Sequence, residues 1–444
     1  MKKKSEAFRV TCFLKDFIEN GAVPAAGQEE DYDRVKNFPV DLEDFIRLKP
    51  LVKFIGVTKA FQEIVRFFHA GPGETPAGFR AEYELEPGGC LTVDLKRDIG
   101  YGKNSEKRPT GMLFSADCAD PYKIRAFKSV LANVTTNPSI IYDRFINDEK
   151  ANVGHRFTTR EQVLRELADI VGPGVDISVE LNHPFAEEKE VLEEAEKFKE
   201  ILSPYRLVVK VPHLGPVTSE NMGQLLDGTF PLRFNCAATE SAFRSHELAA
   251  MLADHGYRVN FTLMSEPHQT AMALQVKPSY INTFMRNRYH HSERIDNLLK
   301  CYKATEDETY LKNLRTYLID SYYLSAGDTN MSLFEVKRMG EWLLKYRGWH
   351  DHRGEDGLDQ ARYSLRQLKH SNLPETRLII CSMDGEMYSM VDQMLMEEEF
   401  ADMADRVIIS ASPDYLAGFT SSPAVLEYNR SFIAAALQEG KKTC

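Results

Sequence analysis

The sequence predicts an α/β protein whose main part is a (β/α)8, or TIM, barrel. Between about Gly111 and Leu416, short apolar runs alternate with amphipathic segments of helix length, which is the pattern of βα units around a parallel sheet. The runs number eight, which is the strand number of this barrel. Polar side chains gather near the carboxyl ends of several runs, where such barrels hold their functional residues.

The predicted strands are short and are bounded by turn-forming residues. In chain order they are Met112–Ala116, Val130–Thr135, Val175–Leu181, Arg206–Val211, Tyr257–Leu263, Ser279–Phe284, Arg377–Ser382 and Arg406–Ser410. Between them, apolar residues recur at steps of three and four. This spacing predicts helices over about 160–167, 187–202, 242–254 and 386–396.

Three regions exceed a minimal barrel. Residues 1–110 precede the first strand and predict an N-terminal extension packed on the barrel, with Gly/Pro-rich turns around a small β-hairpin. Residues 219–238 lengthen the fourth connection. An aromatic-rich tract over about 289–375 predicts a helical insertion between the sixth and seventh strands. The barrel with this insertion is therefore expected to span 111–440.

Composition narrows the function classes. The 444 residues are 43% hydrophobic and 27% charged, and the chain has neither a run of roughly 18 apolar residues nor a signal-peptide pattern at its start. The net charge of −11 disfavours nucleic acid and anionic membranes as partners. The 7 cysteines are scattered without a C-x-x-C pair, which indicates neither a disulfide framework nor a zinc site. A soluble cytoplasmic protein without metal or cofactor is expected.

Alternation along the strands places polar side chains inside the barrel or at strand ends. These residues are Asp117, Asp176, Ser178, Glu180, Lys210, Asn260 and Thr262. Lys210 is the most informative, because lysine is rarely buried, and burial without a partner lowers a lysine's pKa. A neutral amine attacks a carbonyl to give a Schiff base. The alternative is a structural lysine paired with Glu180 or Asp117 across the barrel.

The segment Asn133–Ile141 reads NVTTNPSII and runs from a strand directly into turn-forming residues. It follows a first strand ending at Asp117, and the sequence VVKVP around Lys210 comes about seventy residues later. This arrangement resembles the transaldolase family of class I, Schiff-base aldolases, which includes the fructose-6-phosphate aldolases. The resemblance covers roughly residues 111–416. It implies a cofactor-independent barrel enzyme of carbohydrate metabolism, in the pentose phosphate pathway.

The resemblance implies a role for each matching residue. Lys210 would form the Schiff base with a ketose, Asp117 would transfer the proton during carbon–carbon cleavage, and Glu180 with Thr262 would hold the catalytic water. The residues implied in substrate binding are Thr136, Asn137, Asn260, Asn282, Phe284, Arg286, Arg288 and Ser382. The implied activity is transfer or cleavage of a three-carbon ketol unit, and the types of residue at Glu180 and Phe284 match the transferases of the family. A local turn formed with Pro138 is the other interpretation of Thr135, Thr136 and Asn137.

Two strands depart from the family pattern. On the sixth strand the phosphate-binding arginine is displaced by one residue in either direction, to Arg286 or Arg288. On the seventh, Asp384 stands where the family has an arginine, which removes a bidentate donor and adds repulsion towards a phosphate. Ordinary sugar phosphates are therefore not expected to bind in the usual way, unless a basic residue of the 289–375 tract takes over.

Other function classes stay open. A catalytically altered barrel could bind a ligand or a partner protein without forming a Schiff base. A lyase acting on a non-phosphorylated substrate would keep the lysine chemistry. A metal enzyme using His183, His213 and the segment His350-Asp351-His352 is a further alternative. A small sugar or sugar phosphate is the expected partner, while the donor, the acceptor, the role of residues 1–110 and homo-oligomer formation are left open.

Overall fold

The computed structural model describes residues 11–203, 205–351, 354–383 and 387–439 of the chain. The chain divides into two compact units. The first unit comprises the residues up to Thr110 together with the short segments Val171–Asp176 and Ser203–Arg206. The second comprises Gly111–Ile170, Ile177–Leu202 and the chain from Leu207 onwards.

The first unit contains a four-stranded sheet and a short antiparallel pair. The sheet order is β2 (Val23–Pro24), β4 (Phe54–Val57), β6 (Cys90–Arg97) and β5 (Phe79–Glu86), and β1 (Cys12–Phe13) pairs with β3 (Pro39–Val40). Its helices are α1 (Leu14–Ile18), α2 (Glu29–Val35), α3 (Leu42–Leu48) and α4 (Lys59–Phe67). β5 and β6 form the predicted β-hairpin, which turns through Gly88 and Gly89 at φ values of 97° and 88° that side-chain-bearing residues rarely adopt.

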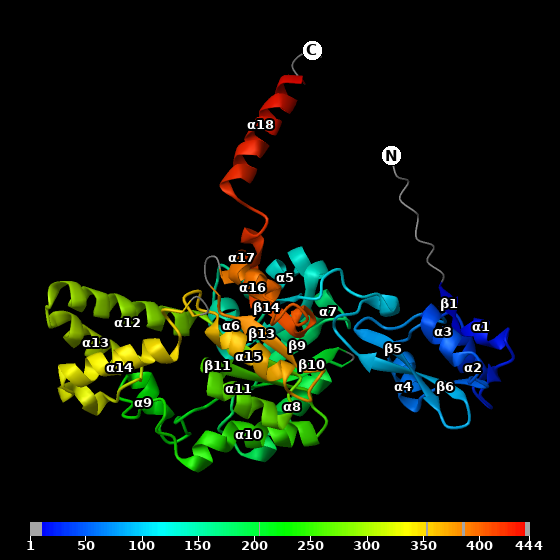
Figure 1. Ribbon diagram of the computed structural model, residues 1–444, viewed down its shortest axis with the longest axis horizontal. Coiled ribbons are helices and arrows are strands. Elements are labelled where there is room, and N and C mark those ends of the chain that lie inside the picture. The colour runs from blue at the N-terminus through cyan, green and yellow to red at the C-terminus, as the bar shows by residue number, and fades with distance from the viewer. Residues whose placement is uncertain (1–10, 204, 352–353, 384–386, 440–444) are drawn as a thin grey trace. The chain divides into compact units, whose positions relative to one another are not determined.

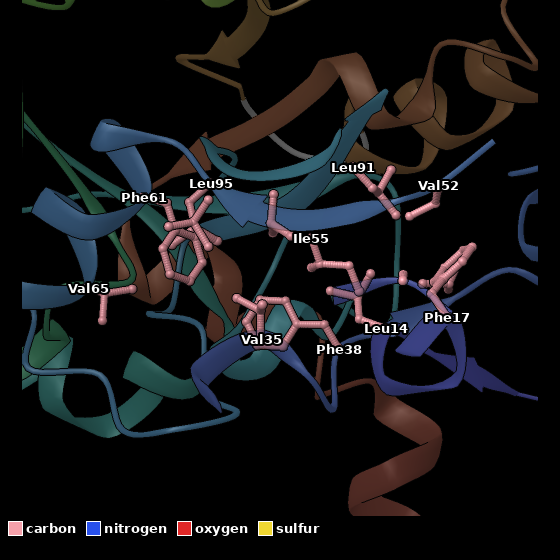
Figure 2. Close-up of a cluster of buried hydrophobic side chains, with 14 of the residues drawn as sticks. Leu14, Phe17, Val35, Phe38, Val52, Ile55, Phe61, Val65, Leu91 and Leu95 are labelled. Carbon is pink, nitrogen blue, oxygen red and sulfur yellow. The ribbon is translucent and has the colours of Figure 1, made fainter. Parts of the chain in front are cut away.

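Side chains from these helices and strands form one hydrophobic core (Figure 2). Helix α4 shows how the sequence builds it. Thr58 Oγ1 accepts a hydrogen bond from Phe61 N at 3.0 Å and so caps the first turn. Phe61 and Val65, four residues apart on one face, are then buried against Leu95 and its neighbours. The first unit therefore has its own apolar interior.

The second unit is built on a closed barrel of eight parallel strands, which is consistent with the TIM-barrel class (Figure 1). The strands are β7 (Leu113–Asp117), β8 (Leu131–Thr136), β9 (Asp176–Glu180), β10 (Arg206–Pro212), β11 (Val259–Met264), β12 (Tyr280–Phe284), β13 (Arg377–Cys381) and β14 (Val407–Ala411). Neighbours in the ring are neighbours in the sequence, and β14 pairs with β7. The predicted barrel and its eight strands are confirmed.

Helices follow the strands in the order expected of βα units. Those of the barrel are α5 (Pro121–Phe127), α6 (Pro138–Ile141), α7 (Arg160–Val171), α8 (Glu188–Ile201), α9 (Met222–Asp227), α10 (Thr239–Asp254), α11 (Pro267–Ala273), α16 (Met387–Met396) and α17 (Pro413–Gly418). Helices α7, α8, α10 and α16 confirm the four helices predicted from apolar spacing. The short α9 lies in the long connection between β10 and α10.

Among the described residues between β12 and β13 there are four α-helices. They are α12 (Arg286–Thr305), α13 (Thr309–Asp320), α14 (Leu333–Tyr346) and α15 (Asp359–Lys369). The first three share a hydrophobic core to which Ile295, Leu314 and Val336 each contribute a fully buried side chain. Ser332 and Glu335 form a capping box that starts α14. This part of the chain thus folds around its own apolar contacts.

The last helix is α18 (Pro423–Glu439), and like the short α9 it has no buried residue among those described. Every side chain described between Pro423 and Gln438 is exposed, including large apolar residues such as Leu426, Phe432 and Leu437. Within the described part of the chain, no helix is both long enough and apolar enough to cross a membrane.

Candidate active site

Short polar side chains form a hydrogen-bonded chain across the inside of the barrel. Asn133 Nδ2 donates to Ser115 Oγ at 2.8 Å, and Ser178 Oγ donates to Asn133 Oδ1 at 3.2 Å. Asn260 Nδ2 donates to Ser178 Oγ at 3.4 Å, and Ser410 Oγ donates to Ser115 Oγ at 3.2 Å. All five residues are fully buried. The chain joins five strands and confirms that Ser178 and Asn260 point inwards, as alternation predicts.

Lys210 lies inside the same ring of strands and is only 2% exposed. Its Nζ is 3.0 Å from Glu180 Oε2, and it donates to the main-chain oxygen of Thr136 at 3.0 Å. Glu180 ends β9 and Thr136 ends β8, so both partners stand at the carboxyl side of the barrel. The amine is therefore buried and ion-paired, and its nearest carboxylate is placed to exchange a proton with it.

Asp117, the last residue of β7, belongs to the same electrostatic cluster. Burial raises the pKa of this carboxyl, and the charges of Lys210 and Arg144 only partly offset that effect. The charge of Glu180 raises the pKa of Asp117 further. When ionised, a carboxylate with a raised pKa is a stronger base, which suits a group that accepts a proton from a hydroxyl.

Four buried side-chain oxygen atoms in the barrel strands have no hydrogen-bond partner among the described residues. They are Thr135 Oγ1, Asn260 Oδ1, Thr262 Oγ1 and Asn282 Oδ1. Buried polar atoms are otherwise almost always paired. In the strand register, Asn260 stands opposite Lys210, and Thr262 stands opposite Pro212, two residues further towards the carboxyl end of the barrel. Such a group of unpaired donors and acceptors is typical of a site that binds a polar ligand or water.

A β-bulge shapes this part of β11. Phe261 pairs with Ile281 and Met264 pairs with Thr283, so β11 holds one residue more than β12 between these pairs. Leu263 lies in the bulge with a left-handed φ of 61°, which a leucine rarely adopts. Bulges often lie next to active sites, where they redirect a side chain. Here the bulge follows Thr262 and leaves the Leu263 side chain partly exposed.

The structure places four of the predicted substrate-binding residues around the strand ends. Asn137 caps α6, with Oδ1 accepting from Ile140 N at 2.8 Å, so its oxygen serves the local turn. Phe284 ends β12 and is half-buried. The main-chain oxygen of Ser382 accepts from Arg286 N at 2.7 Å. The charge of Arg286 acts on the pKa of Asp117, which puts this guanidinium within electrostatic reach of the site.

Arg288 is not brought to these residues. Its guanidinium is buried and binds Asp359, with Nε 3.2 Å from Oδ2, and also Glu266. Glu266 Oε1 in turn accepts from Arg347 Nη2 at 3.1 Å. Arg288 therefore joins α12 to α15 and to the start of α11. Asp384, which stands where the transaldolase pattern has an arginine, lies outside the described residues.

Two thiols stand close to this cluster. Burial raises the pKa of Cys118 to about 12, and it also raises the pKa of the fully buried Cys381. The charges of Asp117 and Lys210 act on Cys381. Both thiols stay protonated near neutral pH, so neither competes with Lys210 as a nucleophile.

The two carboxylates open into different spaces. Asp117 lines a cavity of about 530 Å³ whose charged lining residues are Asp117, Asp120, Lys123, Arg144, Asp148, Lys150 and Asp414. Glu180 lines a separate groove of about 340 Å³ with mostly apolar walls. Asp117 and Glu180 therefore face differently lined spaces.

The described histidines are not grouped as metal ligands. Across the residues that the structure describes, no group of three or more His, Cys, Asp or Glu side chains is arranged to hold a metal ion. Burial lowers the pKa of His213 to about 3, with smaller contributions from His246 and His268, so its imidazole is neutral at neutral pH. Of the His350-Asp351-His352 segment, His352 lies outside the described residues.

Sequence reasoning missed Ser115, Asn133, Ser410 and Arg144. Alternation could have found two of them, because Ser115 lies two residues before Asp117 and Asn133 lies two residues before Thr135. Arg144 lies beyond α6, and no local pattern marks it.

No protein-family model matches the chain, and no curated protein shows significant similarity to it. A function for this chain is therefore inferred from the residues of the site and from their geometry.

Proposed function

We propose that the protein is a Schiff-base enzyme of the class I aldolase type that cleaves or transfers a ketone unit of a hydroxyketone, as the resemblance to transaldolases implies. The observation that carries this proposal is the buried Lys210 amine inside a closed barrel, 3.0 Å from Glu180. Asp117, an acid with a raised pKa, lies within its electrostatic reach. The unpaired polar atoms of the barrel strands, one of them on Asn260 opposite the lysine, support a polar ligand inside the same barrel.

The proposed reaction begins when the Lys210 ammonium passes a proton to Glu180. The neutral amine adds to the ketone carbonyl, and loss of water gives an iminium ion. Asp117 takes the proton of the hydroxyl group on the carbon that will leave. The carbon–carbon bond then breaks, its electron pair enters the iminium as an enamine, and an aldehyde departs. The enamine attacks an acceptor aldehyde or takes a proton from Asp117, and water near Glu180 and Thr262 hydrolyses the product iminium.

Covalent trapping tests this proposal. With borohydride and dihydroxyacetone or another short ketone, we expect one adduct per chain, attached at Lys210, by intact-mass and peptide mass spectrometry. Lys210→Met should remove the adduct and lower turnover by about a thousandfold or more, because the nucleophile is lost. Lys277→Met is the matched control, since this lysine follows α11 outside the site. An adduct that persists in Lys210→Met would refute the assignment.

A ligand-binding barrel without catalysis is the second candidate. The observation that favours it is the pair of partners around the Lys210 ammonium, because a lysine held by a carboxylate and a main-chain oxygen can be purely structural. In that case no ketone gives a borohydride adduct, although a polyol or ketone still raises the melting temperature.

A further inference from the structure

A largely apolar groove opens beside the ion pair of Lys210 and Glu180. Glu180 forms part of its wall, and the rest comes from the loop after β9, the end of β10 with its following loop, α9 and the bulge of β11. The apolar residues lining it are Phe185, Pro212, Leu214, Val217, Met222, Leu225, Leu226 and Leu263. Glu180, whose carboxylate contacts Lys210, thus also borders a largely apolar groove.

The charges of this groove do not suit a phosphate. Among its described lining residues there is no lysine or arginine, and Glu180 would repel an anion. His213, the other polar residue in the wall, is neutral because burial lowers its pKa to about 3. An apolar group is therefore the favoured occupant, since burying apolar surface is the largest favourable term that such walls can supply.

The groove has room for a group of several carbons. A cavity of roughly 150 Å³ is enough to bind benzene. The groove holds about 340 Å³, so an aromatic ring or a chain of several methylenes fits beside Glu180.

The proposed chemistry assigns a direction to the substrate. Asp117 receives the hydroxyl proton, so the part that leaves as an aldehyde faces the charged cavity lined by Lys123 and Arg144. The other substituent of the ketone lies on the side of Glu180. The groove is next to that side.

We propose that the substrate is a non-phosphorylated β-hydroxyketone, and that its ketone carries an aliphatic or aromatic substituent that binds in the groove between Glu180 and α9. This inference rests on the proposed Schiff-base function and specifies its substrate class. The net reaction is R–CO–CH2–CH(OH)–R′ giving R–CO–CH3 and R′–CHO. One carbon–carbon bond breaks, and the hydroxyl proton passes through Asp117 to the enamine carbon. Water lost on forming the iminium is regained on its hydrolysis.

A series of methyl ketones tests the substrate class. Acetone, 2-pentanone and 2-heptanone, with dihydroxyacetone and its phosphate, are trapped with borohydride on the full chain, and the half-saturating concentration is read from intact mass. We expect this concentration to fall about fourfold per added methylene until the groove is filled. Dihydroxyacetone phosphate should require more ligand than 2-heptanone.

A pair of variants tests the location. Leu225→Asp puts a charge into the groove from the exposed α9. The half-saturating concentration should then no longer fall with chain length, while acetone, which is too short to fill the groove, is still trapped. Leu426→Asp makes the same change on the exposed α18 and should behave as the wild type.

The outcomes separate the two proposals. If short ketones label Lys210 but the half-saturating concentration does not fall with chain length, the substrate class is wrong and the Schiff-base function stands. A lower half-saturating concentration for dihydroxyacetone phosphate than for every alkyl ketone would likewise show that the substrate class is wrong while the Schiff-base function stands. A chain-length dependence that survives in Leu225→Asp places the substituent elsewhere and overturns the assignment of the groove. If no ketone labels Lys210, the proposed function fails and this inference fails with it.

Discussion

At the scale of single residues, Asp117 makes the stability of the fold depend on pH. Burial raises the pKa of this carboxyl in the folded chain, so the folded state holds its proton to a higher pH than the unfolded state does. The free energy of unfolding therefore falls as the pH rises from the ordinary aspartate range through the raised value. Across that window, ionisation of Asp117 lowers the free energy of unfolding. The same ionisation is required if Asp117 acts as a base, as proposed.

Asp117→Asn should remove this dependence. We expect the variant to melt at a higher temperature than the wild type above the window, and the difference to shrink as the pH falls towards the ordinary range of an aspartate. Turnover should fall by about a hundredfold or more, since proton transfer by a placed side chain contributes that much. Thermal unfolding between about pH 4 and pH 8 checks the first point. A difference in melting temperature that stays constant with pH contradicts it.

Some residues of the candidate site can be predicted from the sequence and others cannot, for a physical reason. A lysine or an acid in an apolar strand stands out, because the cost of burying a charge makes such positions rare, and Lys210 and Glu180 were found in this way. Asn137 was found as well, but its side-chain oxygen serves the cap of α6. The tight pairing of Arg288 with Asp359 and Glu266 joins residues far apart in the chain, and nothing local to Arg288 indicates it.

At the level of elements, the strands are well predicted and their irregularities are not. Each predicted run agrees with its strand to within two residues at either end, because eight buried strands require apolar runs separated by turns. The bulge in β11 was missed. Asn260 to Met264 contains no glycine and reads as an ordinary alternating strand, so only the pairing with β12 reveals the extra residue.

The bulge yields a test of backbone strain. Leu263→Gly relieves a left-handed conformation that costs a leucine about 1–2 kcal/mol. Leu225→Gly removes a similarly exposed leucine from the same groove, but it lies in α9, where glycine costs about 1 kcal/mol. The two effects add, so we expect Leu263→Gly to be the more stable variant by about 2–3 kcal/mol in urea unfolding. Equal losses in the two variants would show that the bulge is not strained.

The ion-pair network of α12 gives a second test between elements. Glu266 bridges the buried guanidinium groups of Arg288 and Arg347, so Glu266→Ala leaves two buried cations with one partner fewer. We expect it to lower the free energy of unfolding by about 3–5 kcal/mol. Glu341→Ala breaks an exposed pair with Lys337 and should cost less than about 1 kcal/mol. Similar small losses in both variants, measured by urea unfolding, would contradict this account.

On the scale of the whole molecule, helix α18 is separable from the rest of the fold. Because none of its described side chains is buried, deleting residues 423–444 removes no core contact among the described residues. We expect the melting temperature of the truncated chain to lie within about 2 °C of the wild type in dilute solution, measured by differential scanning calorimetry. A fall of about 8 °C or more would mean that α18 is covered in solution.

The same helix has a practical consequence for handling the protein. Val425, Leu426, Phe432, Ile433 and Leu437 present a hydrocarbon surface to water over much of its length. Mild detergents and hydrophobic chromatography resins should therefore bind the protein at α18. This helix is far in sequence from every residue of the lysine site. Purification yield and elution profile become readouts of this segment, independent of any catalytic assay.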